Sequence, residues 1–399
     1  MSVSLLDDFN KVLRVGIERG ASDVHVKVGL PPIFRIDGRL IPLKDAPRYT
    51  TEDVTHLAHD IMGDERYRER FREHNDIDLA YGVGGLGRFR VNIFQQRGTL
   101  GMVFRLIPPA VKSFDELNLP PVMERIASEN RGLVLVTGTT GTGKSTTLAA
   151  LIEYINQNRT EHIITIEDPI EFLHRDKKSI INQRQIGVDC FEFARALRSA
   201  LREDPDVILV GEMRDFDTIE TAILAAETGH LVFSTLHTLD ATETINRIIS
   251  IFPSYQQRHV RMQLAALIKA VISQRLIPRA DGMGRVPAVE VLVSTSRIRE
   301  CIEDADKTKK ITEAISQGYT TYGMQTFDQS IMYLYTKGLI TYEEALRQCT
   351  NPDDFALKVR GISSTSDAAW TDFDRRSERE RDREATVADA PPIERFERS

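Results

Sequence analysis

The chain has 399 residues, of which 41% are hydrophobic and 28% are charged, and its net charge is −7. This length and composition fit a globular protein with two domains and a tail, and the acidic balance excludes a surface coated in basic charge, so we expect no nucleic-acid partner. Three scattered cysteines without a C-x-x-C pair suit a reducing cytosol and predict no zinc site.

Membrane-spanning segments are not expected. No apolar run approaches the roughly 18 residues that cross a bilayer, and the N-terminus lacks a basic stretch followed by an apolar one. We therefore expect a cytoplasmic chain without direct membrane insertion, which would reach a membrane only through a partner.

Residues 1–105 are predicted to form a mixed α/β domain. Apolar residues recur at helical spacing from Leu5 to Arg19, and Gly20 ends this helix. Asp37-Gly38 is a plausible hairpin turn. Alternating apolar and polar residues predict strands at Val24–Val28, Ile33–Leu40 and Gly87–Phe94, and a further strand is expected at Leu100–Leu106.

A second domain is predicted over residues 115–361, after a linker at 106–114 that contains Pro108-Pro109. A helix is expected to restart at 113–117, where the linker ends. Beyond Gly132, short apolar strands alternate with helices, as expected for a parallel sheet covered on both faces. The pattern becomes mainly helical after Arg261, and Thr341–Glu344 forms a capping box that opens a late helix. The mixed-charge residues 362–399 are predicted to be a disordered tail. The expected strands are Leu133–Val136, Ile163–Ile166, Val207–Val210 and Leu231–Thr235.

A phosphate-binding loop stands between the first of these strands and a helix expected from Ser145 to Asn156. It matches the pattern G-x-x-x-x-G-K-[ST] in full, and the strand and helix around it separate a working loop from a chance match. Its backbone N–H groups would surround phosphate oxygens, Lys144 would reach the β- and γ-phosphates, and Ser145 would bind Mg²⁺. The predicted cofactors are therefore ATP and Mg²⁺. The candidate nucleotide-binding residues are Gly138, Thr139, Thr140, Gly141, Thr142, Gly143, Lys144, Ser145 and Thr146.

Carboxylates follow two of the predicted strands. Glu171 comes shortly after Ile163–Ile166, and Glu212 follows Val207–Val210 almost directly. Ligands of parallel α/β sheets collect at the carboxyl ends of strands, where these groups would hold Mg²⁺ or activate the attacking water. We expect Glu212 to serve with Ser145 at the metal. Each carboxylate alone is about as well explained as a surface residue, but the nearby loop favours function.

Two histidines flank the strand Leu231–Thr235. His237 falls just past its end, where a sensor of the γ-phosphate would sit, while a structural role is equally compatible with the local sequence. His230 and His237 would point to opposite faces, so a shared metal is not expected.

Several segments resemble the secretion ATPases of the type II and type IV pilus class. Leu201–Asp215 is similar to the family's Walker-B signature, Thr165–Glu171 to its Asp box and Gly229–Thr238 to its His box. Gly20–His25 resembles the opening of the pilus retraction ATPases. The likeness covers about residues 5–360 and is greatest to the PilT/PilU group of twitching-motility ATPases.

The resemblance implies a PAS-like N-terminal domain, a RecA-like ATPase domain with C-terminal helices, and a homo-hexamer with ATP between the domains of adjoining subunits. It also implies a motor for pilus retraction that acts at the inner membrane through a platform protein, with a paralogous retraction ATPase as a further possible partner. By position Glu212, Glu171 and His237 match catalytic groups of the family. Arginine fingers are expected from the N-terminal domain, and Arg97 and Arg105 are preferred over Arg88 and Arg90, although all four also suit a soluble strand surface.

Departures from the family pattern leave alternatives open. The segment Asn182–Gln185 carries Gln where the family usually has Glu, and Glu303 reverses the final charge of the retraction motif at Arg297–Glu303. Segment 96–103 and the charged tail look more like PilU, whereas the Walker-B and His boxes look like PilT. One alternative is therefore an ATP-binding accessory subunit with weak hydrolysis. A pilus or secretion assembly ATPase is another, although the four-cysteine zinc motif of such proteins is absent.

Overall fold

The computed structural model describes residues 4–36, 38–107 and 110–361. The predicted tail at 362–399, the Pro108-Pro109 pair and Asp37 of the expected turn lie outside the described residues. The chain divides into two compact units, Met1–Val111 with Glu171–Leu173, and Lys112–Ile170 with His174–Ser399. No helix of the described residues is long and apolar enough to cross a bilayer.

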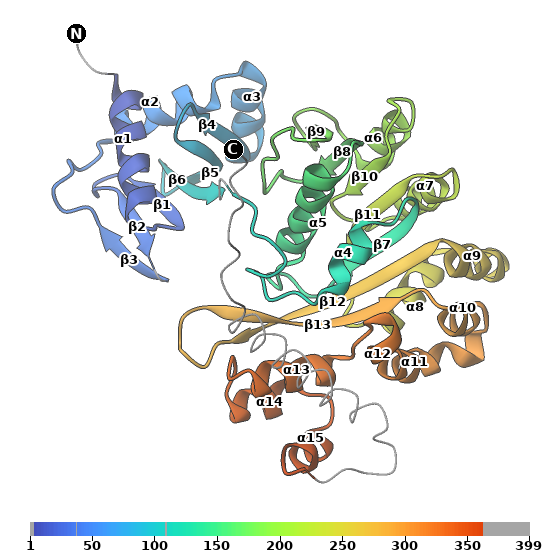
Figure 1. The fold of residues 1–399 in the computed structure, drawn as a ribbon. Helices are drawn as coiled ribbons and strands as arrows, with labels where there is room; N and C mark the ends of the chain where they lie inside the picture. Colours follow the sequence, from blue (N-terminus) through green and yellow to red (C-terminus); the bar gives the residue numbers. More distant parts are fainter. Residues whose placement is uncertain (1–3, 37, 108–109, 362–399) are drawn as a thin grey trace, which may run out of the picture. The chain divides into compact units, whose positions relative to one another are not determined.

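The first unit is built on an antiparallel sheet of six strands in the order β3-β2-β1-β6-β5-β4 (Figure 1). Three helices accompany the sheet. The elements are α1 (Leu5–Glu18), β1 (Asp23–Lys27), β2 (Ile33–Ile36), β3 (Arg39–Pro42), α2 (Thr51–Met62), α3 (Glu65–His74), β4 (Asp76–Val83), β5 (Gly87–Gln96) and β6 (Thr99–Ile107).

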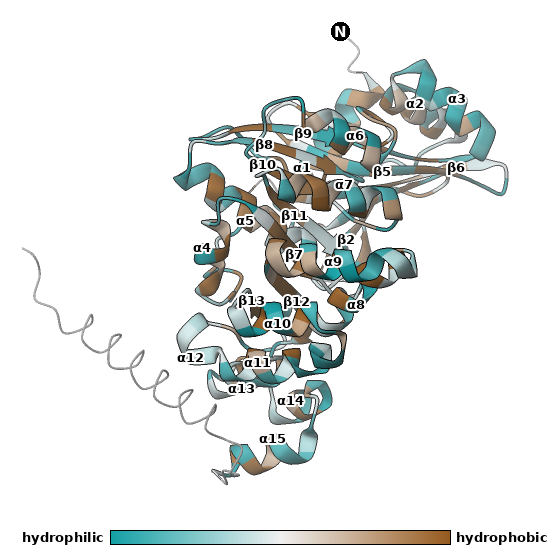
Figure 2. Cartoon of the chain, turned by 90° about the vertical axis from the view of Figure 1, so that its right-hand side faces the viewer, coloured by the Kyte–Doolittle hydropathy of each residue, from teal (hydrophilic) through white to brown (hydrophobic). Residues whose placement is uncertain are grey.

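The core of this unit follows the two-residue period of its strands. On β5 the alternate residues Phe89, Val91 and Ile93 are buried, and they share a core with residues of α1 and α2. The helix α3 buries none of its residues, in keeping with its hydrophilic sequence, and it is coloured teal along much of its length in Figure 2. The alternation predicted for Gly87–Phe94 is thus confirmed.

The second unit contains a seven-stranded sheet in the order β13-β12-β7-β11-β10-β8-β9, in which only the edge strand β13 runs antiparallel to its neighbour. Its strands are β7 (Gly132–Thr137), β8 (His162–Glu167), β9 (Ile180–Gln185), β10 (Val207–Val210), β11 (Leu231–Leu236), β12 (Ile268–Pro278) and β13 (Arg285–Val293). The helices are α4 (Val122–Ala127), α5 (Lys144–Asn158), α6 (Phe193–Ala200), α7 (Phe216–Glu227), α8 (Ala241–Ile251), α9 (Ser254–Leu267), α10 (Ser296–Glu303), α11 (Ile311–Gln317), α12 (Tyr319–Tyr322), α13 (Phe327–Thr336), α14 (Tyr342–Gln348) and α15 (Pro352–Val359), with a 3₁₀ helix at Ala305–Lys310.

Both faces of the central strands are covered. All six residues of β7 are buried. Leu133 and Leu135 belong to one core with residues of helices α6 to α11, whereas the alternate residues Val134 and Val136 point to the opposite face, where α5 packs on β7. The continuous apolar runs in the sequence therefore correspond to a parallel sheet between two helical layers, as predicted.

The strands β12 and β13 are a correction to the sequence analysis, which expected mainly helices after Arg261. Helix α9 passes directly into β12 at Ile268, without Gly or Pro to separate the two patterns. The residues of β12 from Ala270 to Gln274 are all buried, and a short continuous apolar run does not distinguish a buried strand from a buried helix. The expected helices do follow, from α10 onward. Thr341 caps α14 by accepting the N–H of Glu344.

The helix predicted to restart at 113–117 is also wrong, because residues 114–118 form a turn. Ser113 and Glu116 do make the bonds of a helix start, since the Ser113 hydroxyl accepts the Glu116 N–H and the Glu116 carboxylate accepts the Ser113 N–H. Asn118 then adopts a φ of 54°, and Pro120 follows it. A left-handed residue and a proline end the segment before a full helix forms.

Candidate nucleotide-binding site

The glycine loop at 138–143 connects β7 to α5, and its backbone needs glycine. Gly138, Gly141 and Gly143 have φ angles of 138°, 80° and 91°, a region that other residues avoid. A Cβ on Gly138 would lie 2.5 Å from the carbonyl oxygen of Gln274 on β12. The loop thus has the backbone geometry that lets N–H groups converge on an anion.

Lys144 begins α5 and is held by its own loop. Its side chain is buried, and Nζ donates hydrogen bonds to the carbonyl oxygens of Gly138 at 2.8 Å and Thr139 at 3.0 Å. The N-cap of α5 is Gly143, which offers no side chain to accept the first N–H groups of this 15-residue helix. A phosphate is the acceptor that such a helix start favours. Ser145, the next residue, is exposed, as its predicted contact with a metal-bound nucleotide requires.

The predicted catalytic groups of this unit gather at one edge of the sheet. Strands β7, β11, β10 and β8 are neighbours and parallel, with Thr137 paired to Leu236 and Val210 paired to both Ser234 and Ile166. Their carboxyl ends therefore lie at the same edge, beside the glycine loop. Sequence order alone did not reveal that β11 lies between β7 and β10.

Glu212 and His237 meet at this edge. Nε2 of His237 lies 3.6 Å from Oε2 of Glu212, and the Glu212 side chain is only 19% exposed. Arg214 approaches the same oxygen at 2.8 Å. Arg214, which stands two residues beyond Glu212, is a functional candidate that the motifs did not indicate. A carboxylate held between an imidazole and a guanidinium has a fixed position from which it can orient a water molecule.

Another carboxylate, Glu167, ends β8 and was not selected from the sequence. Oε1 of Glu167 accepts hydrogen bonds from the Thr165 hydroxyl at 2.6 Å and from Nε2 of Gln183 at 3.2 Å. The Gln183 side-chain oxygen accepts the backbone N–H of His174. The side-chain amide of Gln183 therefore donates to the Glu167 carboxylate and accepts from the backbone N–H of His174.

Glu171 is exposed, four residues beyond the end of β8. The segment after it is anchored at His174, whose nearly buried ring places Nδ1 3.3 Å from Oε2 of Glu153 on α5. Burial holds the pKa of His174 below its ordinary value. Lys177 also contacts the Glu153 carboxylate. The catalytic role of Glu171 stays a prediction.

The candidate arginine fingers lie in the first unit. Arg97 occupies the tight turn between β5 and β6 with a φ of 47°. Arg105 lies on β6, where its Nε is 2.9 Å from the buried Asp23 carboxylate, and the Arg105 side chain is 67% exposed. Burial alone would raise the pKa of Asp23, but hydrogen bonds from Ser22 and Arg105 hold it below its usual value. Arg105 thus has a structural partner within its own unit, and both finger roles stay predictions.

The other histidine of the His box has a structural role. Nδ1 of His230 lies 2.8 Å from the carbonyl oxygen of Ala225 at the end of α7. Within residues 4–36, 38–107 and 110–361, no group of three or more His, Cys, Asp or Glu side chains could hold a metal ion by itself.

A cavity of about 490 Å³ adjoins the start of α5. Thr142, Gly143 and Thr146 line one part of it, and Gln274 and Arg279 from β12 and the loop after it line another. Gln274 is buried and donates through Nε2 to the hydroxyl of Thr147 on α5. Gln274 and Arg279 were not among the residues predicted for the site, because no strand was expected at 268–278.

The fold and the site together define a P-loop ATPase. The family model of type II/IV secretion system proteins matches residues 3–347, and the chain belongs to this family. It is 47% identical to the type IV pilus retraction ATPase PilT of Pseudomonas aeruginosa, over 87% of this chain and 100% of that protein. It is 40% identical to the type IV pilus ATPase PilU of the same organism, over 90% and 93%.

Two solved structures of ATPases share this fold. The crystal structure of the pilus retraction motor PilT with bound ADP is 47% identical and superposes with a TM-score of 0.80, covering 88% of this chain and 98% of that one. The ATPase DotB of Legionella pneumophila is 27% identical with a TM-score of 0.70, covering 89% and 95%. The resemblance drawn from the sequence motifs is thereby confirmed.

Proposed function

We propose that this protein is the ATP-hydrolysing motor of type IV pilus retraction. The observation that carries the hydrolytic part is the meeting of Glu212 and His237 at the sheet edge beside the glycine loop. The retraction part is supported by the identity to PilT along that protein's whole length. A nucleotide is also bound in the PilT structure that this fold matches.

The chain's own residues would bind the nucleotide as follows. Backbone N–H groups of the loop and of the α5 start would surround the phosphates, and Lys144 would exchange its carbonyl partners for phosphate oxygens. The base and ribose would extend into the adjoining cavity of about 490 Å³. Mg²⁺ prefers oxygen ligands, and the hydroxyl of Ser145 and the carboxylate of Glu212 fit it together with phosphate oxygens; the ion would neutralise charge on the phosphates.

Hydrolysis requires a water aligned with the γ-phosphate. Glu212 would accept a proton from this water or orient it, because its carboxylate is held at the strand end by His237 and Arg214. His237 would contact the γ-phosphate and report its presence to helix α8, which begins four residues later. Glu171 is a second candidate for the water.

At the level of assembly, we propose a homo-hexamer in which the first unit is PAS-like and the second is RecA-like. The antiparallel sheet with its helices and the parallel sheet with its glycine loop support these two assignments. Arg97 and Arg105 would act as fingers toward a nucleotide of the ring. The ring would sit at the cytoplasmic side of the inner membrane, against a platform protein of the pilus base.

A cellular assay tests the proposal. In cells that lack this gene, we expect pilus retraction and twitching to be lost, restored by the wild-type gene and not by Glu212→Gln at equal protein level. The physical reason is that the variant retains the fold and the nucleotide but not the activated water. Retraction restored by Glu212→Gln would show that hydrolysis at this site does not drive the movement.

The similarity to PilU favours a second candidate, an accessory subunit that binds ATP, hydrolyses it weakly and assists a paralogous motor. Steady-state turnover of the purified protein separates the two functions. For a motor, we expect turnover well above that of a Lys144→Ala control, since that substitution removes a phosphate contact. Turnover equal to the control, with ATP bound, would assign the accessory role instead.

A further inference from the structure

Glu290 is a buried carboxylate outside the predicted catalytic set. It lies on β13 with 4% of its surface exposed, and its Oε1 accepts the backbone N–H of Ala241 at 2.8 Å. Ala241 is the first residue of α8. The first N–H groups of a helix have no partner within the helix, so this bond from a residue 49 positions away satisfies one of them.

The start of α8 is in turn bonded to the loop that carries His237. The backbone N–H of Leu239 donates to Oε2 of Glu243 at 2.8 Å, and the hydroxyls of Thr238 and Thr244 lie 2.6 Å apart in a buried position. Asp240 caps the helix through the N–H of Glu243. The loop between β11 and α8 is thus fixed to the first turn of α8.

These contacts form a continuous path from the outermost strand β13 to the carboxyl ends of the central strands, where Glu212 and His237 meet. Glu290 holds the start of α8, the first turn of α8 holds Thr238 and Leu239, and the preceding residue His237 contacts Glu212. We propose that Glu290 is a positioning residue, which holds His237 in register with Glu212 by anchoring α8 to β13. The inference rests on the proposed hydrolytic role of His237.

The hydrogen bond from Ala241 requires an acceptor oxygen on Glu290 and does not require a charge there. Burial raises the pKa of Glu290 to about 7, although the hydrogen bond from Ala241 lowers it. The charges of Asp240 on the α8 cap and Asp328 on α13 raise this pKa further, and the charge of Arg275 on β12 lowers it. Both protonation states are therefore present near neutral pH, and both offer an oxygen to the N–H of Ala241. Glutamine offers the same oxygen without a charge.

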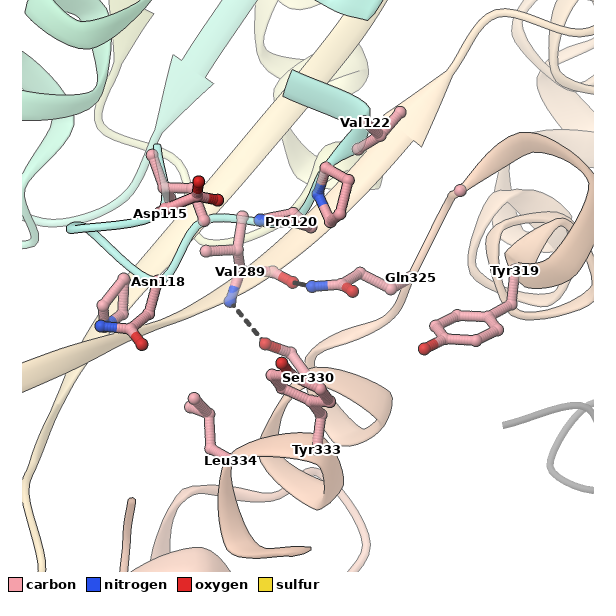
Figure 3. A pocket seen from close by; sticks show the side chains of 14 residues that line it. Asp115, Asn118, Pro120, Val122, Val289, Tyr319, Gln325, Ser330, Tyr333 and Leu334 are labelled. Carbon is pink, nitrogen blue, oxygen red and sulfur yellow. Dashed lines mark hydrogen bonds between the residues drawn. The ribbon is translucent and has the colours of Figure 1, made fainter. Parts of the chain in front are cut away.

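Ser330 on α13 supplies a matched control, because it bonds to Val289, the residue before Glu290 on β13. The N–H of Val289 donates to the hydroxyl of Ser330 on α13 at 3.0 Å, and Nε2 of Gln325 donates to the Val289 carbonyl oxygen at 2.7 Å. Figure 3 shows both bonds beside a cavity of about 210 Å³. Ser330→Ala removes a buried acceptor of the N–H of Val289, and this bond does not involve α8. It should lower thermal stability in the same way as loss of Glu290 does.

The test compares kcat, the dissociation constant for ATP and thermal stability among these variants. For Glu290→Ala we expect kcat to fall about tenfold or more while nucleotide affinity stays within about threefold, because the bond concerns the sensor loop and not the phosphate cradle. Glu290→Gln should restore kcat to within about threefold of wild type. Ser330→Ala should lose stability and keep kcat. Wild-type kcat in a folded Glu290→Ala would overturn the proposal.

A double-mutant cycle with His237 separates positioning from general support of the fold. In a His237→Ala background, Glu290→Ala should lower kcat less than about twofold further, because the residue it positions is already gone. An equal loss in both backgrounds would show that Glu290 does not act through His237. If Glu290→Ala does not fold, Ala241→Pro removes the donor instead, at a first helical position that tolerates proline. Wild-type kcat in that variant would equally overturn the inference.

Hydrogen exchange distinguishes failure of this inference from failure of the proposed function. Wild-type turnover no higher than that of Lys144→Ala would refute the hydrolytic function. The backbone amides of 238–244 still report the anchoring in that case, because they exchange through local opening. We expect faster exchange there in Glu290→Ala and wild-type exchange in Ser330→Ala. Unchanged exchange in Glu290→Ala would overturn the anchoring itself.

Discussion

Glu212→Gln is expected to reduce steady-state ATP hydrolysis by about 10²–10⁴-fold, because an amide cannot take the proton of the attacking water. ATP binding should be retained within a few-fold, since the loop N–H groups and Lys144 that would hold the phosphates are untouched. Phosphate release measured over many turnovers gives the rate, and equilibrium binding of a fluorescent ATP analogue gives the affinity.

Glu220→Gln is the matched control for this experiment. Glu220 carries an exposed carboxylate on α7, so its substitution makes the same change of charge away from the sheet edge. We expect its turnover to equal that of wild type. Turnover by Glu212→Gln at the control's rate would remove Glu212 from the chemistry and leave Glu167 or Glu171 as the group to examine.

Lys144→Ala should lose nucleotide affinity itself. A charge-assisted hydrogen bond contributes about 1.5–3 kcal/mol. Its loss corresponds to a rise of about tenfold to a hundredfold in the dissociation constant of ATP. Isothermal titration calorimetry with ATP and Mg²⁺ measures this constant directly. Hydrolysis should fall with it, because Lys144 would also balance charge on the transferred phosphoryl group.

Lys178→Ala provides the comparison, since Lys178 is an exposed lysine on the same unit. The two variants change the net charge equally, so any general electrostatic attraction of ATP is weakened alike in both. A loss of ATP affinity of about tenfold or more is therefore expected only in Lys144→Ala. Equal affinity in all three proteins would exclude the loop as the nucleotide site.

Local patterns predicted the elements that carry the site. The glycine loop was found because its signal is contiguous and lies between an apolar strand and a helix, which the structure has as β7 and α5. The strands before Glu212 and His237 were also predicted, because short apolar runs bounded by polar residues are typical of a covered parallel sheet. The β12 strand was missed, because no turn residue separates it from α9.

The sequence by itself therefore determined the loop, the family motifs and the residues that end each central strand, all of which are features of neighbouring residues. Only the tertiary structure decided which of these residues meet. The order β7-β11-β10-β8 brings His237 to Glu212, and the chain's return as β13 brings Glu290 to Ala241. The physical reason is that strand order and long-range hydrogen bonds depend on packing across the whole sheet, which no short segment encodes.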